Sequence, residues 1–193
     1  MRRRDFIGLA GWAAVVCPLA VKAQQANKVY RIGMISAGLP PNSGRSEFQD
    51  SLSERGWIEG KNLIYERRYA ENRLERLPEL VAELIRLNVD VIVAIGTLAP
   101  IAAKRATTTI PIVMTAAGDP LGSGLVASLA KPGGNVTGLS LMAPELAGKR
   151  LELLKEVIPG LTRIAVLWNA ANPYCAIVFD QTKLAAGTLG IEV

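Results

Sequence analysis

Short runs of β-branched and other apolar residues alternate with segments of helical periodicity along most of this 193-residue chain. In its first part, the apolar runs cover 29–35, 63–69, 89–95, 110–115 and 136–141. Between two of these runs, Leu77, Leu80, Val81, Leu84 and Ile85 recur at the spacing of one helix face. Parallel strands joined by crossover helices give this alternation, because each helix packs back on the sheet. We therefore predict an α/β fold built on a doubly wound parallel sheet.

Local signals predict the place of individual segments. The run 63–69 contains several charged residues, which suit a strand at the edge of a sheet. The run 89–95 is nearly continuous in apolar residues, as a strand buried on both faces should be. Gly56 followed by Trp57 predicts a helix that ends with a glycine cap and its hydrophobic contact. Residues 122–130 are expected to be helical.

The same alternation begins again after residue 141. We predict a helix over 144–157, a buried strand over 163–168 and a helix over 173–189, with 191–193 as the start of a further strand. A sheet with one strand and the start of another cannot cover its own helices. The second half of the pattern is therefore expected to be incomplete.

These patterns predict three segments: a leader over 1–23, a first α/β unit over 24–140, and an incomplete second α/β unit over 141–193. The leader has three arginines before an apolar stretch and a small residue, Ala23, after which a signal peptidase would cut. Arg3-Arg4 also resembles a twin-arginine export signal, so the export route stays open. A retained membrane anchor is the alternative, although the stretch is shorter than the roughly 20 residues that a span needs.

Charge and residue types exclude several functions. The chain has a formal charge of +5, of which +3 falls within the leader. The rest carries no basic footprint for a nucleic acid. There is no histidine, so neither a Ser-His-Asp nor a Cys-His catalytic arrangement is available, and zinc sites lose their commonest ligand. There is no Walker loop either. We predict no catalytic residue, no metal site and no cofactor, and Cys175, alone once the leader is cut, as a small apolar residue on a helix.

One glycine motif, at 122–127, matches the spacing of a dinucleotide fingerprint. Six residues, 116–121, separate it from the preceding strand, and no acidic residue ends the next strand to hold a ribose. Close packing of a helix against the sheet explains these glycines better.

Small polar residues follow the predicted parallel strands, at the sheet edge where open α/β sheets bind ligands. The predicted ligand-binding residues are Ser36, Gly96, Thr97, Asp119, Asn169 and Asn172. Ser36 and Thr97 are placed to hold a carboxylate beside the start of a helix, and Asp119 to take an ammonium group. Asp119 and Asn172 each precede a proline, so an ordinary turn or helix cap is the alternative for both.

Several stretches, in order along the chain, match one family. They are GWIEGKN at 56–62, RLPEL at 76–80, AAKRATTTIPIV at 102–113, GDP at 118–120, KPGGNVTG at 131–138, ELAGKRL at 145–151 and VLWN at 166–169. In these the chain closely resembles the ABC-transporter substrate-binding proteins with the type I periplasmic binding fold, whose relatives are often assigned to tryptophan, tyrosine or other small solutes.

The resemblance implies two α/β lobes joined by a hinge at 136–141, so that 24–140 would be the first lobe and 141–193 the hinge exit with an incomplete second lobe. It also implies a small solute such as an amino acid caught between the lobes, and an ABC permease as membrane partner. Ser36, Thr97 and Asp119 would then face the cleft from the first lobe, and Asn169 and Asn172 from the second. The chain departs from the family in length, since members usually complete the second lobe. Two alternatives remain: a periplasmic α/β enzyme acting on a nucleotide or sugar, and a sensor domain of a transcription regulator.

Overall fold

The computed structural model describes residues 28–42, 46–141 and 144–193. By its internal contacts the chain divides into two compact units: Met1–Tyr30 with Arg45–Ile64, the small unit, and Arg31–Gly44 with Tyr65–Val193, the large unit. The predicted leader over 1–23 lies outside the described residues, and the predicted boundary between lobes at 140 and 141 stays a prediction.

The small unit contains α2 (Glu47–Glu54), whose two ends follow from local sequence. At its start, Ser46 and Gln49 form a capping box, in which each side chain accepts a hydrogen bond from the backbone N–H of the other. At its end, Gly56 adopts a left-handed φ of 86°, and the N–H of Trp57 donates to the carbonyl of Leu52 at 2.9 Å. The predicted glycine cap is therefore confirmed.

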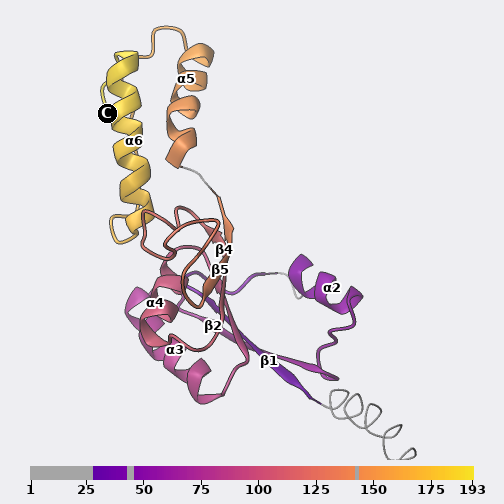
Figure 1. Cartoon of the computed structure of the whole chain (residues 1–193). Coiled ribbons are helices and arrows are strands. Elements are labelled where there is room, and N and C mark those ends of the chain that lie inside the picture. Colours follow the sequence, from indigo (N-terminus) through magenta and orange to yellow (C-terminus); the bar gives the residue numbers. More distant parts are fainter. Residues whose placement is uncertain (1–27, 43–45, 142–143) are drawn as a thin grey trace, which may run out of the picture. The chain divides into compact units, whose positions relative to one another are not determined.

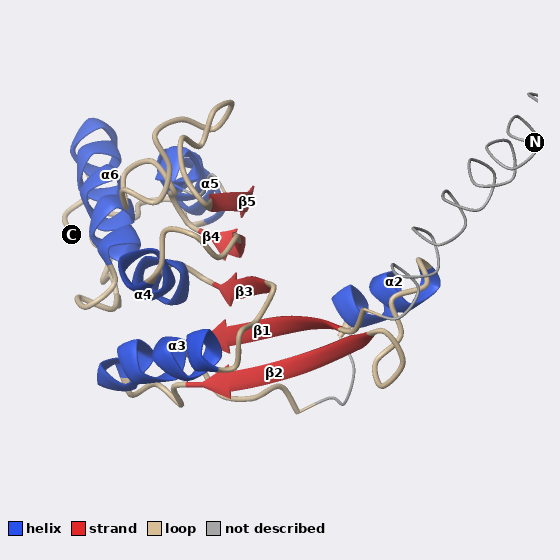
Figure 2. Cartoon of the chain, turned by 60° about the horizontal axis from the view of Figure 1, so that its bottom comes forward, coloured by secondary structure: helices blue, strands red, loops and turns tan. Residues whose placement is uncertain are grey.

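The large unit is built on a five-stranded sheet in the order β2-β1-β3-β4-β5 (Figures 1 and 2). The strands are β1 (Tyr30–Ser36), β2 (Leu63–Tyr69), β3 (Val91–Ile95), β4 (Ile112–Ala117) and β5 (Val136–Ser140), of which β1 and β2 begin in the small unit. The pairs β1 with β3, β3 with β4, and β4 with β5 are parallel. The predicted α/β class with a parallel sheet is confirmed, and β2 lies at the edge as its charges indicated.

Two helices, α3 (Leu77–Arg86) and α4 (Leu98–Ala106), contact each other and cover one face of this sheet (Figure 2). A short 3-10 turn, η1 (Leu74–Arg76), leads into α3. Leu84 of α3 approaches β1 so closely that a Cβ at Gly33 would lie only 3.0 Å from its Cδ1 atom. The core of the sheet contains Ile92 and Ile112, both wholly buried; burying a side chain of this size stabilises the fold by about 1.5–3 kcal/mol.

Helices α5 (Ala147–Val157) and α6 (Pro173–Leu189) pack side by side around a small second core (Figure 1). That core contains Leu151, Ala186 and Ile191. A 3-10 turn, η2 (Pro144–Leu146), precedes α5, so the predicted helix over 144–157 begins with a tighter turn. Among the described helices, none combines the length and the apolar character that a membrane crossing requires.

The predicted helix over 122–130 is wrong. These residues form successive turns, in which the N–H of Leu125 donates to the carbonyl of Pro120 and that of Ala127 to the carbonyl of Pro132. Gly124 has a left-handed φ of 70°, which interrupts a helix. The backbone groups of this loop are therefore satisfied by turns rather than by a helical ladder.

The predicted buried strand over 163–168 is also wrong. Its pairing is limited to one parallel bridge between Arg163 and Glu192, and the Leu167 side chain is fully exposed. A buried strand needs neighbouring strands on both sides, and among the described residues this segment has only the bridge to Glu192. The bridge does confirm that 191–193 starts to pair as a strand.

Candidate functional site

The large unit contains a cavity of about 460 Å³ at the carboxyl edge of its sheet. It is lined by residues at or just after the ends of β1, β2 and β3 and by residues that precede α6. The lining residues are Ser36, Ala37, Gly38, Asn72, Leu74, Ile95, Gly96, Thr97, Leu98, Asn169 and Asn172. The cavity therefore brings together Ser36, Gly96, Thr97, Asn169 and Asn172, five of the six residues that the sequence predicted as a group.

The two hydroxyl groups of the cavity already accept hydrogen bonds from the protein. The Ser36 Oγ accepts from the N–H of Gly38 at 3.1 Å, and the Thr97 Oγ1 accepts from the buried N–H of Gly118 at 3.1 Å. A backbone N–H can only donate, so each hydroxyl keeps its own hydrogen for another partner. Both hydroxyls can therefore donate into the cavity.

Asn169 and Asn172, two of the three asparagines that line the cavity, also accept hydrogen bonds from the backbone. The Asn169 Oδ1 accepts from the N–H of Ala171 at 3.0 Å, and the Asn172 Oδ1 accepts from the N–H of Tyr174 at 3.1 Å. These contacts fix the amide orientation, because a backbone N–H requires an oxygen as acceptor. The amide nitrogen Nδ2 of each of these two residues remains a hydrogen-bond donor. Asn172 is at the same time the N-cap of α6, so the alternative reading of this residue is confirmed.

Asp119 is the predicted residue that does not line the cavity. Its Oδ1 accepts hydrogen bonds from the N–H groups of Leu121 at 3.1 Å and Gly122 at 2.9 Å. This is the turn that its position before Pro120 indicated as the alternative role. A contact with a ligand ammonium stays a prediction.

Backbone in the left-handed region gathers at this edge of the sheet. After β2, Glu71 and Asn72 have φ of 55° and 63°; after β3, Gly96 has φ of 81°; and in β4, Ala116 has φ of 56°. A Cβ at Gly96 would meet no atom within 4 Å, so the backbone conformation rather than space favours glycine there. Residues held in such conformations concentrate at ligand sites.

Asn72 and Leu74 line the cavity although the sequence did not single them out. They follow β2, whose charged residues predicted only that this strand lies at the edge of the sheet. The signal was present, because Asn72 follows a parallel strand at the same edge as Ser36, and asparagine tolerates the left-handed conformation. The N–H of Asn72 donates to the carbonyl of Ala37 at 2.8 Å, which ties the two loops together.

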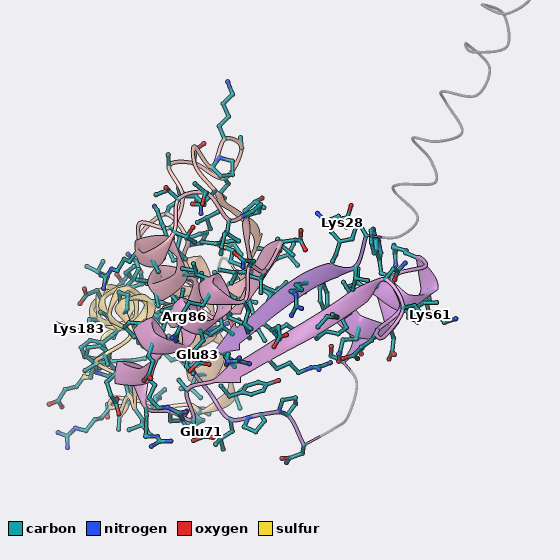
Figure 3. The ribbon with its side chains drawn as sticks, turned by 90° about the horizontal axis from the view of Figure 1, so that it is seen from below. Lys28, Lys61, Glu71, Glu83, Arg86 and Lys183 are labelled. Carbon is teal, nitrogen blue, oxygen red and sulfur yellow. The ribbon has the colours of Figure 1, made fainter. Side chains whose placement is uncertain are left out.

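Glu71, labelled in Figure 3, anchors the outer side of the loop after β2. Its Oε2 accepts hydrogen bonds from Arg73 at 2.8 Å and Arg76 at 3.0 Å. The hydrogen bond from Arg73, followed by the charge of Arg76, holds the pKa of this exposed carboxyl below its ordinary value. Its neighbour Asn72 lines the cavity, whereas the carboxylate of Glu71 is bonded to the two arginines.

Nothing in the described part of the chain gathers three or more His, Cys, Asp or Glu side chains as a metal site would. The glycines at 122–127 lie in turns rather than at the start of a helix. A Cβ at Gly122 would overlap the Oδ2 of Asp119 in the same loop and would lie 2.7 Å from the Cδ1 of Ile177 in α6, so close packing is the observed role of this glycine. It packs against α6 instead of against the sheet.

A parallel α/β sheet with a polar cavity at its carboxyl edge is the arrangement by which open α/β proteins bind small molecules. Comparison with known proteins identifies the family within this class. The family profile described as ABC transporter substrate binding protein matches residues 42–193. This chain belongs to that family, and its sheet with the flanking helices is a lobe of the type I periplasmic binding fold.

Relatives and solved structures agree with this assignment. A protein of Clostridioides difficile called tyrosine-binding protein is 34% identical over 140 residues, which cover 72% of this chain and 40% of that protein. The crystal structure of a conserved domain protein from Vibrio cholerae has a TM-score of 0.79 at 33% identity and matches 86% of this chain. An ABC domain from Streptococcus pneumoniae in complex with L-Trp has a TM-score of 0.77 at 27% identity.

The chain spans 40% of that curated relative, and 57% and 56% of the two solved chains. Members of the family are the substrate-binding components of ABC transporters.

Proposed function

We propose that this chain captures a small solute outside the cytoplasm for an ABC importer and does not convert it. Membership of the family supports this proposal. The observation that carries it is the cavity at the carboxyl edge of the sheet, lined by Ser36, Thr97, Asn169 and Asn172. The partner would be an ABC permease that recognises the loaded protein.

The proposed ligand is an amino acid, bound first through its carboxylate. Each of the four polar side chains just named has an oxygen committed to a backbone N–H, which leaves hydrogen-bond donors directed to other partners. A carboxylate offers only acceptors, and hydrogen bonds to a charged group contribute about 1.5–3 kcal/mol each. The described lining residues include no basic side chain, so these neutral donors and the start of α4 would carry the recognition.

The named ligands of relatives support an amino acid. The Clostridioides difficile relative is called a tyrosine-binding protein, and the Streptococcus pneumoniae structure contains L-Trp. A cavity of about 460 Å³ has room for an aromatic amino acid. Within the proposal, Asp119 would take the ligand ammonium only if its loop moved to the cavity, because Asp119 does not line it. Its Oδ1 is bonded to two backbone N–H groups, and its Oδ2 would be the oxygen that accepts from the ammonium group.

Isothermal titration of residues 24–193 with L-tyrosine, L-tryptophan and L-leucine is the direct measurement. We expect saturable binding of at least one of them and no new product by mass spectrometry after incubation. The matched control is the corresponding amino acid amide, which lacks the carboxylate and should lose most of the affinity. Conversion of any of these compounds would instead favour the alternative of a periplasmic enzyme.

Export belongs to the same proposal. The leader over 1–23, with cleavage after Ala23, would deliver the protein to the periplasm through the Sec or the twin-arginine route. N-terminal sequencing of the protein recovered from a periplasmic extract should read from Gln24. Recovery only from the cytoplasm with the leader intact would contradict this part of the proposal.

A further inference from the structure

The first turn of α6 packs directly on the loop that follows β4. A Cβ built on Gly118 would overlap the ring atoms Cγ, Cδ2 and Cε2 of Tyr174. One on Gly122 would overlap the Oδ2 of Asp119 and would lie 2.7 Å from the Cδ1 of Ile177. Tyr174 and Ile177 are three residues apart, so they lie on the same face of the helix. Two glycines of one loop thus form a seat for two side chains of α6.

Position 118 needs glycine because there is no room for a side chain, and not because of its backbone conformation. Neither Gly118 nor Gly122 is among the glycines with a positive φ. Any residue can adopt such a backbone, so an alanine at 118 would be tolerated if the Tyr174 ring were elsewhere. Gly118 is itself buried, and the ring of Tyr174 occupies the place that a side chain would take.

This contact joins the two walls of the cavity. On one side, the N–H of Gly118 donates to the Oγ1 of Thr97, which lines the cavity after β3. On the other side, the N–H of Tyr174 donates to the Oδ1 of Asn172, which lines the cavity before α6. The ring of Tyr174 on Gly118 therefore connects two cavity residues that are 75 positions apart in the sequence.

We propose that Tyr174 is a positioning residue for solute capture: its ring, seated on Gly118, holds Asn172 opposite Thr97. This inference rests on the proposed function, which it deepens. The apparent affinity of a protein whose binding-competent arrangement is only partly populated falls in proportion to that population. A side chain that lifts the ring from Gly118 should therefore weaken binding without touching the ligand.

The experiment compares variants of the full chain. Gly118→Ala should displace the ring, Tyr174→Ala should remove it, and Tyr174→Phe should keep it and behave as the original. The matched control is Gly134→Ala, since a Cβ there would meet nothing within 4 Å and its φ is not positive. In the Tyr174→Ala background, Gly118→Ala should reduce ligand affinity little further, because the ring with which the added methyl group would clash is gone.

Two measurements distinguish this inference from the proposed function. Amide hydrogen exchange, read without ligand on peptides covering 118–122 and 172–178, should rise in Gly118→Ala and stay unchanged in Gly134→Ala. Titration with L-tyrosine, L-tryptophan and L-leucine should give a Kd about tenfold higher in Gly118→Ala, if the seated arrangement falls to about a tenth of the population.

The inference is overturned if exchange at both peptides is the same in Gly118→Ala as in the original chain, or if the two bind the amino acids equally well. Equal losses from Gly118→Ala in the presence and absence of the Tyr174 ring would also overturn it. If the original chain binds none of the amino acids, the proposed function fails and the positioning role falls with it, while the exchange data still report whether the contact exists.

Discussion

The Oγ1 of Thr97, at the start of α4, accepts a hydrogen bond of 3.1 Å from the N–H of Gly118 in the loop after β4, and both residues are buried. This single bond connects the ends of two neighbouring strands. It also places the Thr97 hydroxyl at the cavity, because the bond to Gly118 uses one lone pair and leaves the hydroxyl hydrogen free to turn elsewhere.

Thr97→Val keeps the shape of the side chain and removes the acceptor for the Gly118 N–H. A buried donor left without a partner costs about 1–3 kcal/mol. We expect the free energy of unfolding, measured by urea denaturation, to fall by that amount. The control is Thr108→Val at an exposed position, where the change should stay within about 0.5 kcal/mol. Equal stability of both variants would contradict the role given to this bond.

Asn172 has two separable roles, one for each atom of its amide. Asn172→Asp keeps an oxygen that can accept from the N–H of Tyr174, and aspartate is as good an N-cap as asparagine, so stability should be preserved. The substitution replaces the Nδ2 donor by a negative charge, so binding of a carboxylate ligand should be lost.

Asn172→Ala provides the comparison, since it removes both the cap and the donor and should lower stability by about 0.5–2 kcal/mol. Thermal unfolding followed by circular dichroism, together with titration of L-tryptophan, separates the two roles. Full ligand affinity in Asn172→Asp would show that the Nδ2 group of Asn172 does not contact the ligand.

Gly138 of β5 has a φ of 139°, and a Cβ there would lie 2.8 Å from the backbone nitrogen of Met114 and 2.9 Å from its carbonyl carbon. Both atoms belong to β4, which pairs with β5, so they cannot move aside without breaking the ladder. Gly138→Ala should destabilise the chain by about 1–3 kcal/mol, the usual cost of overpacking. Gly134→Ala, in open space, is the control in the same denaturation series.

The hydrogen bond from Arg73 and the charge of Arg76 lower the pKa of Glu71 below its ordinary value of 4.5. A carboxyl with a depressed pKa in the folded state contributes stability above its unfolded pKa, and that contribution disappears as the pH falls through the folded pKa. We expect the Glu71 carboxyl to titrate below pH 4.5 in an NMR titration. Glu71→Gln should lessen the acid-induced loss of stability in that window, weakly and less so at high salt, because the group is exposed.

Most of the sheet could be predicted from the sequence because its strands are bounded by local signals. The apolar run that becomes β3 is nearly continuous, and the charged run that becomes β2 lies at the edge. The segment 163–168 has the same local signal as β3 and yet pairs only through Arg163. A run of apolar residues predicts that a strand can form, whereas the partners that bury it lie elsewhere in the chain.

For the candidate site, too, the sequence predicted where residues lie but not which contacts their side chains make. Residues after strands were found because the carboxyl ends of parallel strands meet at one edge, which is a rule of topology. Asp119 obeys the same rule but turns its carboxylate to the N–H groups of Leu121 and Gly122. The seat of Tyr174 on Gly118 could not be read from the sequence, because it depends on how two segments more than 50 residues apart approach each other.

The polar groups that line the cavity are hydroxyls, amides and backbone, and none of its described lining residues is acidic, basic, a cysteine or a tyrosine. A binding surface of this kind keeps one protonation state from mildly acidic to mildly alkaline water. The lining residues themselves would therefore add no change of affinity with pH.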